Sequence, residues 1–317
     1  MTPELYRLRE SIALPTLPSV ATKLIELAND PDSQLEEIEK LIRLDPVLSS
    51  KLLSIANSVW YGSRIKSNTV TQALRVIGLN SAMSLALSFS LVRVVKEQNS
   101  QGLGYELFWK RSLLAGVVAR SIGVRLANKI NPEELFIAAL LQDIAILSLC
   151  KIDSSLYLQG ASLQKNHSQL SAYERKRFAH DHAEIGAWLL GGWNLPDYIV
   201  ESVRLSHNSS GIKQGRLQLS SIVALSGCLA DLLLWPGDRV IYDKAQEMAS
   251  GFTITGENLA ELLKDVISHV PEIENLFEVR LFNQNPELLL KEAKSLIARR
   301  QADELAAYTE NNRGKRP

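Results

Sequence analysis

Apolar residues recur at helical spacing through almost the whole chain, and no segment shows the strict alternation of apolar and polar residues typical of a half-buried strand. The segment that follows the first turn is representative, because Leu35, Ile38, Leu41 and Ile42 form one apolar stripe along a helix. Such stripes can be buried only by packing helix on helix when no sheet is available. We therefore predict an all-α protein.

Polar residues between the stripes predict where helices begin and end. Ser33 and Glu36 have the spacing of a capping box, and Asp45–Pro46 pairs a capping carboxylate with proline at the first helical position. We expect further helices at 69–77, 81–96, 106–127, 132–150, 161–164, 171–177, 181–190, 196–206 and 217–234, with two or three more within 256–317.

Composition narrows the class of protein. Hydrophobic residues make up 46% and charged residues 22% of the 317 residues, as in ordinary globular proteins. Thirty-five basic residues balance thirty-five acidic ones, which disfavours nucleic acid and anionic membranes as partners. The charged N-terminus does not resemble a signal peptide, and the longest apolar stretches are too short to span a bilayer. Cys150 and Cys228 lack CxxC spacing and are expected to be buried thiols, so we predict a cytoplasmic protein.

Turn-forming residues divide the predicted helices into groups. The segment NSQGLG, Asn99 to Gly104, is the strongest linker candidate. We predict an N-terminal helical bundle over residues 1–98, packed on a second bundle over 102–234, with a helical extension and polar tail over 235–317.

Several motifs together carry a family resemblance. The N-terminal part contains Leu14–Pro15, Leu17–Pro18, Asp45–Pro46 and Ala56–Asn57–Ser58, and the second bundle contains ELFIAALLQDIAILSL and HDHAEIGAWLLGGWNLPDYIVESVRLSHN. This set resembles the HDOD domain, the HD-related output domain of bacterial signalling proteins. The resemblance covers about residues 11–234. It implies that the second bundle is similar to HD-type metal phosphohydrolases.

The resemblance also implies a ligand set that can be compared with this chain. HD hydrolases hold a divalent metal with a His, a His–Asp doublet and a distant Asp. Here Arg111 stands at the first position, Gln142–Asp143 at the doublet and Gly227 at the distant position, while Asp231 lies one helical turn later. A guanidinium has no lone pair to offer a metal. Only Asp143 is clearly kept, so we expect no catalysis and no catalytic residues.

Asp143 lies in the most apolar predicted helix, where an unpaired carboxylate would be costly. We hypothesise that Arg111 pairs with Asp143 and replaces the charge of the missing metal, with Gln142 filling the remaining hydrogen bonds. The predicted ligand pocket consists of Arg111, Gln142, Asp143, His182 and His207.

The histidines allow two interpretations. Asp143, His182 and His207 could hold one adventitious divalent metal as a remnant site, or the two imidazoles could serve as caps and packing groups at helix ends. We expect no resident metal or cofactor. His180 is predicted to be exposed, and His167 and His269 to have surface roles because no constellation surrounds them.

The sequence therefore predicts a non-catalytic HDOD-type module of bacterial signal transduction, acting through a signalling protein partner or a small ligand such as a nucleotide. The alternative is a metal-dependent phosphohydrolase acting on nucleotides through Asp143, His182, His207 and Asp231. A nucleic-acid binder built on the N-terminal helices is a further alternative. Arg120 and Arg125 are also candidate phosphate contacts, although the neutral overall charge disfavours both ideas.

Overall fold

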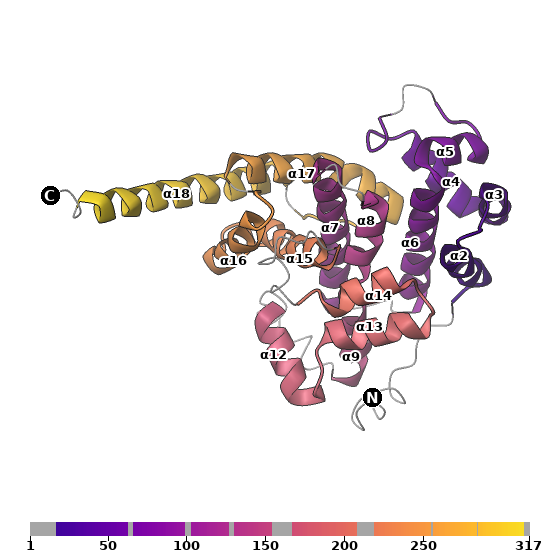
Figure 1. Cartoon of the computed structure of the whole chain (residues 1–317), viewed down its shortest axis with the longest axis horizontal. Coiled ribbons are helices and arrows are strands. Elements are labelled where there is room, and N and C mark those ends of the chain that lie inside the picture. Colours follow the sequence, from indigo (N-terminus) through magenta and orange to yellow (C-terminus); the bar gives the residue numbers. More distant parts are fainter. Residues whose placement is uncertain are drawn as a thin grey trace.

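All regular elements in the described part of the chain are helices, which confirms the all-α prediction (Figure 1). The computed structural model describes residues 17–62, 66–98, 103–126, 130–153, 167–207, 219–254, 256–283 and 285–313. The helix predicted at 161–164 lies outside these residues. The fold consists of an N-terminal bundle, a second bundle in the middle and C-terminal helices on the opposite side (Figure 1).

The N-terminal bundle is organised around α6, which packs against α2, α3, α4 and α5. Asp45 caps α4 as predicted, because its carboxylate accepts the backbone N–H groups of Val47 and Leu48. Gly78, at φ +83°, ends α5 and leads directly into α6, which therefore begins earlier than predicted. The helices are α2 (Ser19–Asn29), α3 (Leu35–Arg43), α4 (Pro46–Ala56), α5 (Val70–Ile77) and α6 (Leu79–Gln98).

The predicted capping box at Ser33 and Glu36 is wrong by one residue. Gln34 is extended and precedes the first turn of α3, and the Glu37 carboxylate accepts its backbone N–H at 3.4 Å. Glutamine is not among the preferred capping residues, so the sequence pattern pointed to the neighbouring serine.

The second bundle has α7 at its centre, and α8 and α15 pack along that helix. The N-terminal bundle packs on it through α6 and α8. Figure 1 shows α7, α8 and α15 between α6 of the N-terminal bundle and α16 of the C-terminal helices. The helices are α7 (Leu103–Leu126), α8 (Pro132–Leu141), α9 (Ile144–Ile152), α12 (His167–Phe178), α13 (His182–Gly192), α14 (Asp197–Arg204) and α15 (Leu219–Leu234).

The single helix predicted over 132–150 is two helices. α8 ends before Gln142, and Asp143, with φ −107° and ψ 12°, separates it from α9. Both halves are apolar nearly all the way round, so no change in periodicity marks the break in the sequence. The break therefore coincides with the doublet that carries the candidate site.

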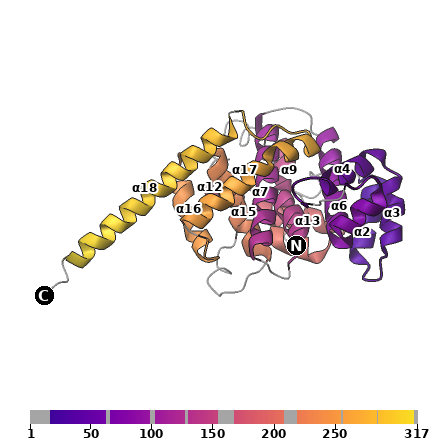
Figure 2. The ribbon, with the colours of Figure 1, turned by 90° about the horizontal axis from the view of Figure 1, so that it is seen from above.

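The C-terminal helices pack back onto the second bundle. They are α16 (Arg239–Ser250), α17 (Glu257–Phe277) and α18 (Pro286–Arg313). α16 packs against α15 and α17 against α7, whereas the far end of α18 points away from the rest of the molecule (Figure 2). α16 was not predicted, although Asp238 caps it by accepting the backbone N–H groups of Val240 and Ile241. The predicted divisions at residues 98 and 234 stay predictions.

A buried charged cluster joins the N-terminal bundle to the second bundle. Arg120 Nε donates to Glu133 Oε1 at 2.8 Å, and its Nη2 donates to the Trp60 carbonyl at 3.1 Å. The Tyr61 hydroxyl donates to the same Glu133 oxygen at 2.7 Å. Arg120 is buried, so the disfavoured alternative in which this side chain contacts phosphates does not hold. The other candidate, Arg125, is paired with Asp265 at 2.9 Å.

The structure tests the predictions about the two cysteines and about membrane-spanning helices. Cys228 is buried as expected, whereas Cys150 is only partly buried. Burial raises the pKa of the Cys150 thiol to about 12, so this thiol stays protonated at neutral pH. Within the described residues, no single helix has the length and apolarity needed to cross a membrane, and only the bent pair α5 and α6, taken together, meets that test.

Candidate functional site

Arg111 is the centre of a buried ion-pair cluster in the second bundle. This side chain on α7 is 6% exposed. Its Nη1 donates to Asp143 Oδ2, which confirms the predicted pairing. Its Nε and Nη2 donate to both oxygens of Asp231 on α15, at 2.7 and 3.1 Å. The bidentate partner of Arg111 is therefore Asp231, the carboxylate that the family pattern placed one turn too late.

Gly227 makes room for the Arg111 guanidinium. A Cβ at this position of α15 would lie 2.8 Å from Arg111 Nη2 and 2.8 Å from Gln142 Oε1. The resemblance places an HD ligand carboxylate at this position, and here the space is filled by the cation. The Arg111 guanidinium can therefore occupy this position only because residue 227 has no side chain.

Replacing Gly227 with alanine is expected to lower the free energy of unfolding by about 1–3 kcal/mol, because the methyl group would overpack a buried ion pair. Urea denaturation measures this change. Gly191→Ala on α13 is the matched control, since nothing lies within 4 Å of the added Cβ. That variant should be neutral or slightly stabilised, because alanine favours helix. Equal stabilities of the two variants would contradict the close packing at Gly227.

Gln142 does not have its predicted role. Its Nε2 donates to the Ala139 carbonyl at 2.9 Å instead of completing the hydrogen bonds of the ion pair. The side chain is turned back toward α8 because α8 ends at this residue. Asp231 and the histidines, not Gln142, complete the surroundings of Arg111 and Asp143.

Two histidines face the other oxygen of Asp143. The Nε2 atoms of His167 and His182 lie 3.3 and 3.4 Å from Asp143 Oδ1, and all three side chains are buried. The prediction of a surface role for His167 is therefore wrong. The first residue of α12 meets the first residue of α13 through the tertiary fold, and no spacing in the sequence indicates this meeting. Burial by itself would raise the pKa of Asp143, but the Arg111 cation and His167 outweigh it and lower that pKa.

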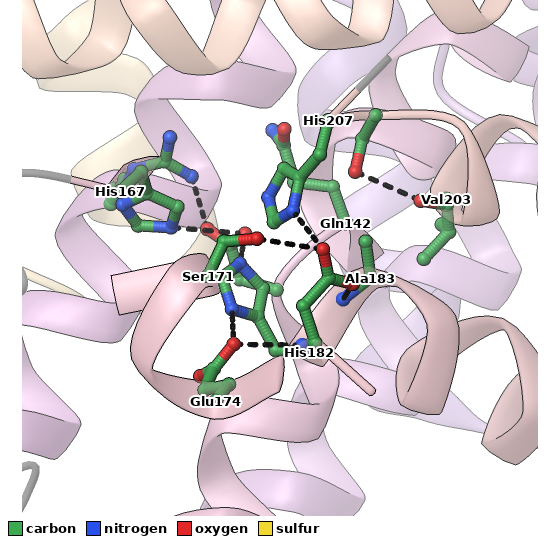
Figure 3. A network of polar contacts seen from close by, with 12 residues as sticks. Gln142, His167, Ser171, Glu174, His182, Ala183, Val203 and His207 are labelled. Atoms are coloured by element: carbon green, nitrogen blue, oxygen red, sulfur yellow. Dashed lines mark hydrogen bonds and ion pairs between the residues drawn. The ribbon is translucent and has the colours of Figure 1, made fainter. Parts of the chain in front are cut away.

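Glu174 on α12 orients His182, and sequence analysis did not identify it. His182 Nδ1 lies 2.5 Å from Glu174 Oε2, and the His182 backbone N–H donates to the same oxygen at 2.9 Å (Figure 3). Both side chains are fully buried. Burial would lower the pKa of His182, but the Glu174 and Asp143 carboxylates outweigh it and raise that pKa to about 10.

His207 is held by Asp181. His207 Nδ1 lies 2.9 Å from Asp181 Oδ2. The same carboxylate accepts Ser171 Oγ at 2.7 Å and caps α13 in the capping box with Glu184. Burial and the neighbouring His182 lower the pKa of His207 to about 4, so this ring is neutral at pH 7. His180, predicted to be exposed, is partly buried, with Nδ1 3.5 Å from Glu184.

A cavity of about 250 Å³ adjoins this cluster. Of the predicted pocket residues, Arg111, Gln142 and His207 line the cavity, whereas Asp143 and His182 are buried outside its lining. α16 contributes Lys244 and Met248, which the sequence could not indicate while that helix was unrecognised. The remaining lining residues are His167, Ser171, Arg175, Ser206, Ala224, Cys228 and Asp231.

A larger cavity of about 490 Å³ lies between α4, α6 and the end of α17, and it shares no lining residue with the first cavity. Its cations are already engaged. Lys51 donates to the Leu276 carbonyl, Lys96 donates to the Phe277 carbonyl at 2.9 Å, and Arg93 pairs with Asp45 at 2.8 Å. These contacts attach the C-terminal end of α17 to the N-terminal bundle, so we treat this cavity as part of the packing between them.

A sequence model of the HDOD domain matches residues 14–209. The chain belongs to the HDOD family. An uncharacterized protein of Treponema pallidum (strain Nichols) is 24% identical to this HDOD protein over 215 residues, which are 67% of the chain and 41% of that relative. The chain thus spans about two fifths of the relative's length.

Solved structures share the HDOD fold. An HDOD domain protein of unknown function from Geobacter sulfurreducens superposes with a TM-score of 0.61 at 19% identity, over 89% of this chain and 99% of that one. A proposed phosphohydrolase from Shewanella amazonensis superposes with a TM-score of 0.59 at 19% identity, over 93% of this chain and 94% of that one. A proposed signal transduction protein from Marinobacter aquaeolei superposes with a TM-score of 0.58 at 20% identity, over 86% of this chain and 61% of that one.

The ligand set that the HD resemblance implies does not fit this HDOD protein. The guanidinium of Arg111 lies between Asp143 and Asp231, beside the side-chain-free Gly227. A divalent cation at that point would meet a fixed positive charge and would lack two of its nitrogen ligands. We therefore derive no reaction step through an HD-type metal at these positions.

Proposed function

We propose that this HDOD protein is a non-catalytic regulatory module of signal transduction in the bacterial cytoplasm, acting by contact with a protein partner or a small ligand. The observation that carries this proposal is the Arg111 cation held by Asp143 and Asp231. A permanent charge in this place can stabilise carboxylates, but it cannot bind and activate water as a metal ion does.

The cavity beside the cluster supports a role in ligand binding. It is lined by Arg175, Lys244 and His207 together with the hydroxyl groups of Ser171 and Ser206. Arg175 and Lys244 bring positive charge to the cavity wall. Arg175 also pairs with Asp181 at 2.6 Å, and the Ser171 and Ser206 hydroxyls donate to Asp181 and to the Val203 carbonyl, so a small anionic ligand would have to compete with these acceptors. A volume of about 250 Å³ is enough for the phosphate-bearing part of a nucleotide but is at the small end of ligand pockets.

The test is phosphoester hydrolysis by the purified full chain. We expect no cleavage of bis(4-nitrophenyl) phosphate, mononucleotides or cyclic dinucleotides above the buffer blank, with Mg²⁺, Mn²⁺, Ni²⁺ or Zn²⁺ present. Thermal shift with the same nucleotides then measures binding, because a ligand that binds only the folded state raises the melting temperature. Turnover that a chelator abolishes, and that Asp143→Asn also loses, would overturn the proposal.

A metal-dependent phosphohydrolase is the second candidate, and one observation favours it. Asp143, His167 and His182 bring their ligand atoms within 4.8 Å of one another. This candidate requires both a bound ion and turnover. The hydrolysis assay therefore separates it from the regulatory module even if the protein binds an ion.

A further inference from the structure

We propose that Asp143, His167 and His182 form a binding site for one divalent transition-metal ion. This site shares Asp143, the one kept HD position, with the Arg111 cluster, and it does not use the HD positions at residues 111, 142 and 227. Its third ligand, His167, comes from outside every motif that carried the family resemblance. The inference goes beyond the proposed function, because an ion can be bound with or without catalysis.

The spacing of the ligand atoms is that of a tetrahedral ion. Asp143 Oδ1 lies 3.3 Å from His167 Nε2 and 3.4 Å from His182 Nε2, and all three atoms lie within 4.8 Å of one another. Zn²⁺ binds nitrogen and oxygen at about 2.0–2.2 Å, which places the ligands of a tetrahedral site about 3.3–3.5 Å apart. The two measured separations therefore match without movement of the backbone.

The site contains buried polar atoms that call for a partner. Asp143 and His182 are 1% and 0% exposed. Asp143 Oδ1 and His182 Nε2 face each other at 3.4 Å, but within the described residues neither atom makes a hydrogen bond of good geometry. Buried polar atoms of this kind are costly, and an ion that accepts a lone pair from each would satisfy both at once.

Glu174 gives His182 the arrangement of a metal-binding histidine. Its carboxylate lies 2.5 Å from His182 Nδ1, on the side of the ring away from Asp143. Metal-bound histidines usually donate their second ring N–H to a carboxylate in this way, which fixes the ring and directs the other nitrogen at the ion. Glu174 is itself fully buried and also fixes the His182 backbone, so the ring is held rigidly.

The surrounding charges favour a cation at this point. Asp143, Glu174 and Asp231 are buried carboxylates. Arg111 pairs with Asp143 and Asp231, whereas Glu174 contacts His182. The guanidinium takes Oδ2 of Asp143 and leaves Oδ1 facing the histidines. A divalent ion bound to Oδ1 would therefore balance negative charge that Arg111 alone does not neutralise.

His167 fits this site better than His207, the third member of the remnant trio expected from the sequence. The ring of His207 is tied to Asp181 through Nδ1, and its centroid lies 4.4 Å from that of His182. His167 Nε2 instead lies 3.3 Å from Asp143 Oδ1. Mixed imidazole and carboxylate ligands suit Zn²⁺, Ni²⁺, Co²⁺ or Fe²⁺ rather than Mg²⁺ or Ca²⁺.

The experiment is metal titration of the full chain after removal of metal with a chelator and exhaustive dialysis. Calorimetry with Zn²⁺ and the visible absorption of Co²⁺ report binding without reference to any activity.

We expect one ion per wild-type chain. We expect His167→Ala to weaken affinity by at least about 100-fold and Glu174→Gln by about 10–100-fold. His180→Ala is the matched control and should bind as the wild type does. Circular dichroism confirms that each variant is folded.

The proposed metal site is contradicted if the wild type binds no ion, or if His167→Ala binds the ion as tightly as the wild type does. It is also overturned if His207→Ala loses the ion while His167→Ala keeps it, because the ligands would then be those of the remnant trio. Asp143→Asn gives a second check that does not depend on His167, since it keeps the shape of the side chain but removes its charge. Undiminished affinity in that variant contradicts the site.

Discussion

Arg111→Met is expected to lower the free energy of unfolding by about 3–5 kcal/mol, because it strands the buried carboxylates of Asp143 and Asp231 without their common cation. Both carboxylates are nearly inaccessible to water, at 1% and 5% exposure, so solvent cannot take over the role of the guanidinium. Urea denaturation in the presence of a chelator measures the loss, since a bound metal ion would otherwise mask part of it.

The dependence of this loss on pH gives a second readout. Burial tends to raise the pKa of Asp143, but Arg111 outweighs it and holds that pKa below its ordinary value. A lowered folded-state pKa contributes stability above the unfolded value of about 3.9, and this stability disappears as the pH falls through the folded value. The gap between wild type and Arg111→Met should therefore be fully present at pH 7 and shrink as the pH falls below about 4.

The matched control is the triple variant Arg111→Met, Asp143→Asn, Asp231→Asn, in which no buried charge of the cluster remains. It should recover part of the stability that Arg111→Met loses. A loss below about 1 kcal/mol in Arg111→Met would show that Arg111 does not compensate these carboxylates.

Glu133→Met is expected to cost a similar amount, about 3–5 kcal/mol, because it leaves the Arg120 guanidinium buried without its carboxylate. Methionine keeps roughly the length of the side chain, so the loss reports mainly the missing charge. Arg120 keeps its contact with the Trp60 carbonyl and the ring of Trp60, which lies 4.4 Å from its Cζ. These neutral contacts do not replace a full charge.

Tyr61→Phe is the control for this cluster. It removes the hydroxyl that donates to Glu133 but leaves the ion pair intact, so a loss of about 1 kcal/mol is expected. Because Trp60 and Tyr61 follow α4 whereas Arg120 and Glu133 lie on α7 and α8, this cluster joins the two bundles. Equal losses in Glu133→Met and Tyr61→Phe would contradict the importance of the charge.

The two clusters show different uses of a buried arginine. Arg120 holds one bundle against the other, and its contacts involve the segment that follows α4. Arg111 lies within the second bundle and links α7 to α15 and to the break between α8 and α9. Only the Arg111 cluster adjoins a polar cavity and a group of histidines, which is why the proposals for binding concern this part of the fold.

Local sequence patterns predicted most of the helices and one half of the site. Apolar stripes identified the helices because burial of a helical face requires that spacing. Asp45 and Asp181 could be recognised as caps because a capping carboxylate acts on backbone groups two or three residues away. The pairing of Arg111 with Asp143 was predictable because a carboxylate in so apolar a segment needs a cation, and the family pattern supplied one at residue 111.

The sequence by itself determined the helical class, the family and the need of Asp143 for a partner, since each follows from residue type and local spacing. Only the tertiary structure decided that Arg111 donates to Asp231 and that Gln142 turns back toward α8. It also decided that His167 and Glu174 lie against His182. The contacts of Asp231, His167 and Glu174 join helices that are far apart along the chain. Their geometry depends on how α12, α13 and α15 pack around α7 and α9, and no periodicity in a single segment records that packing.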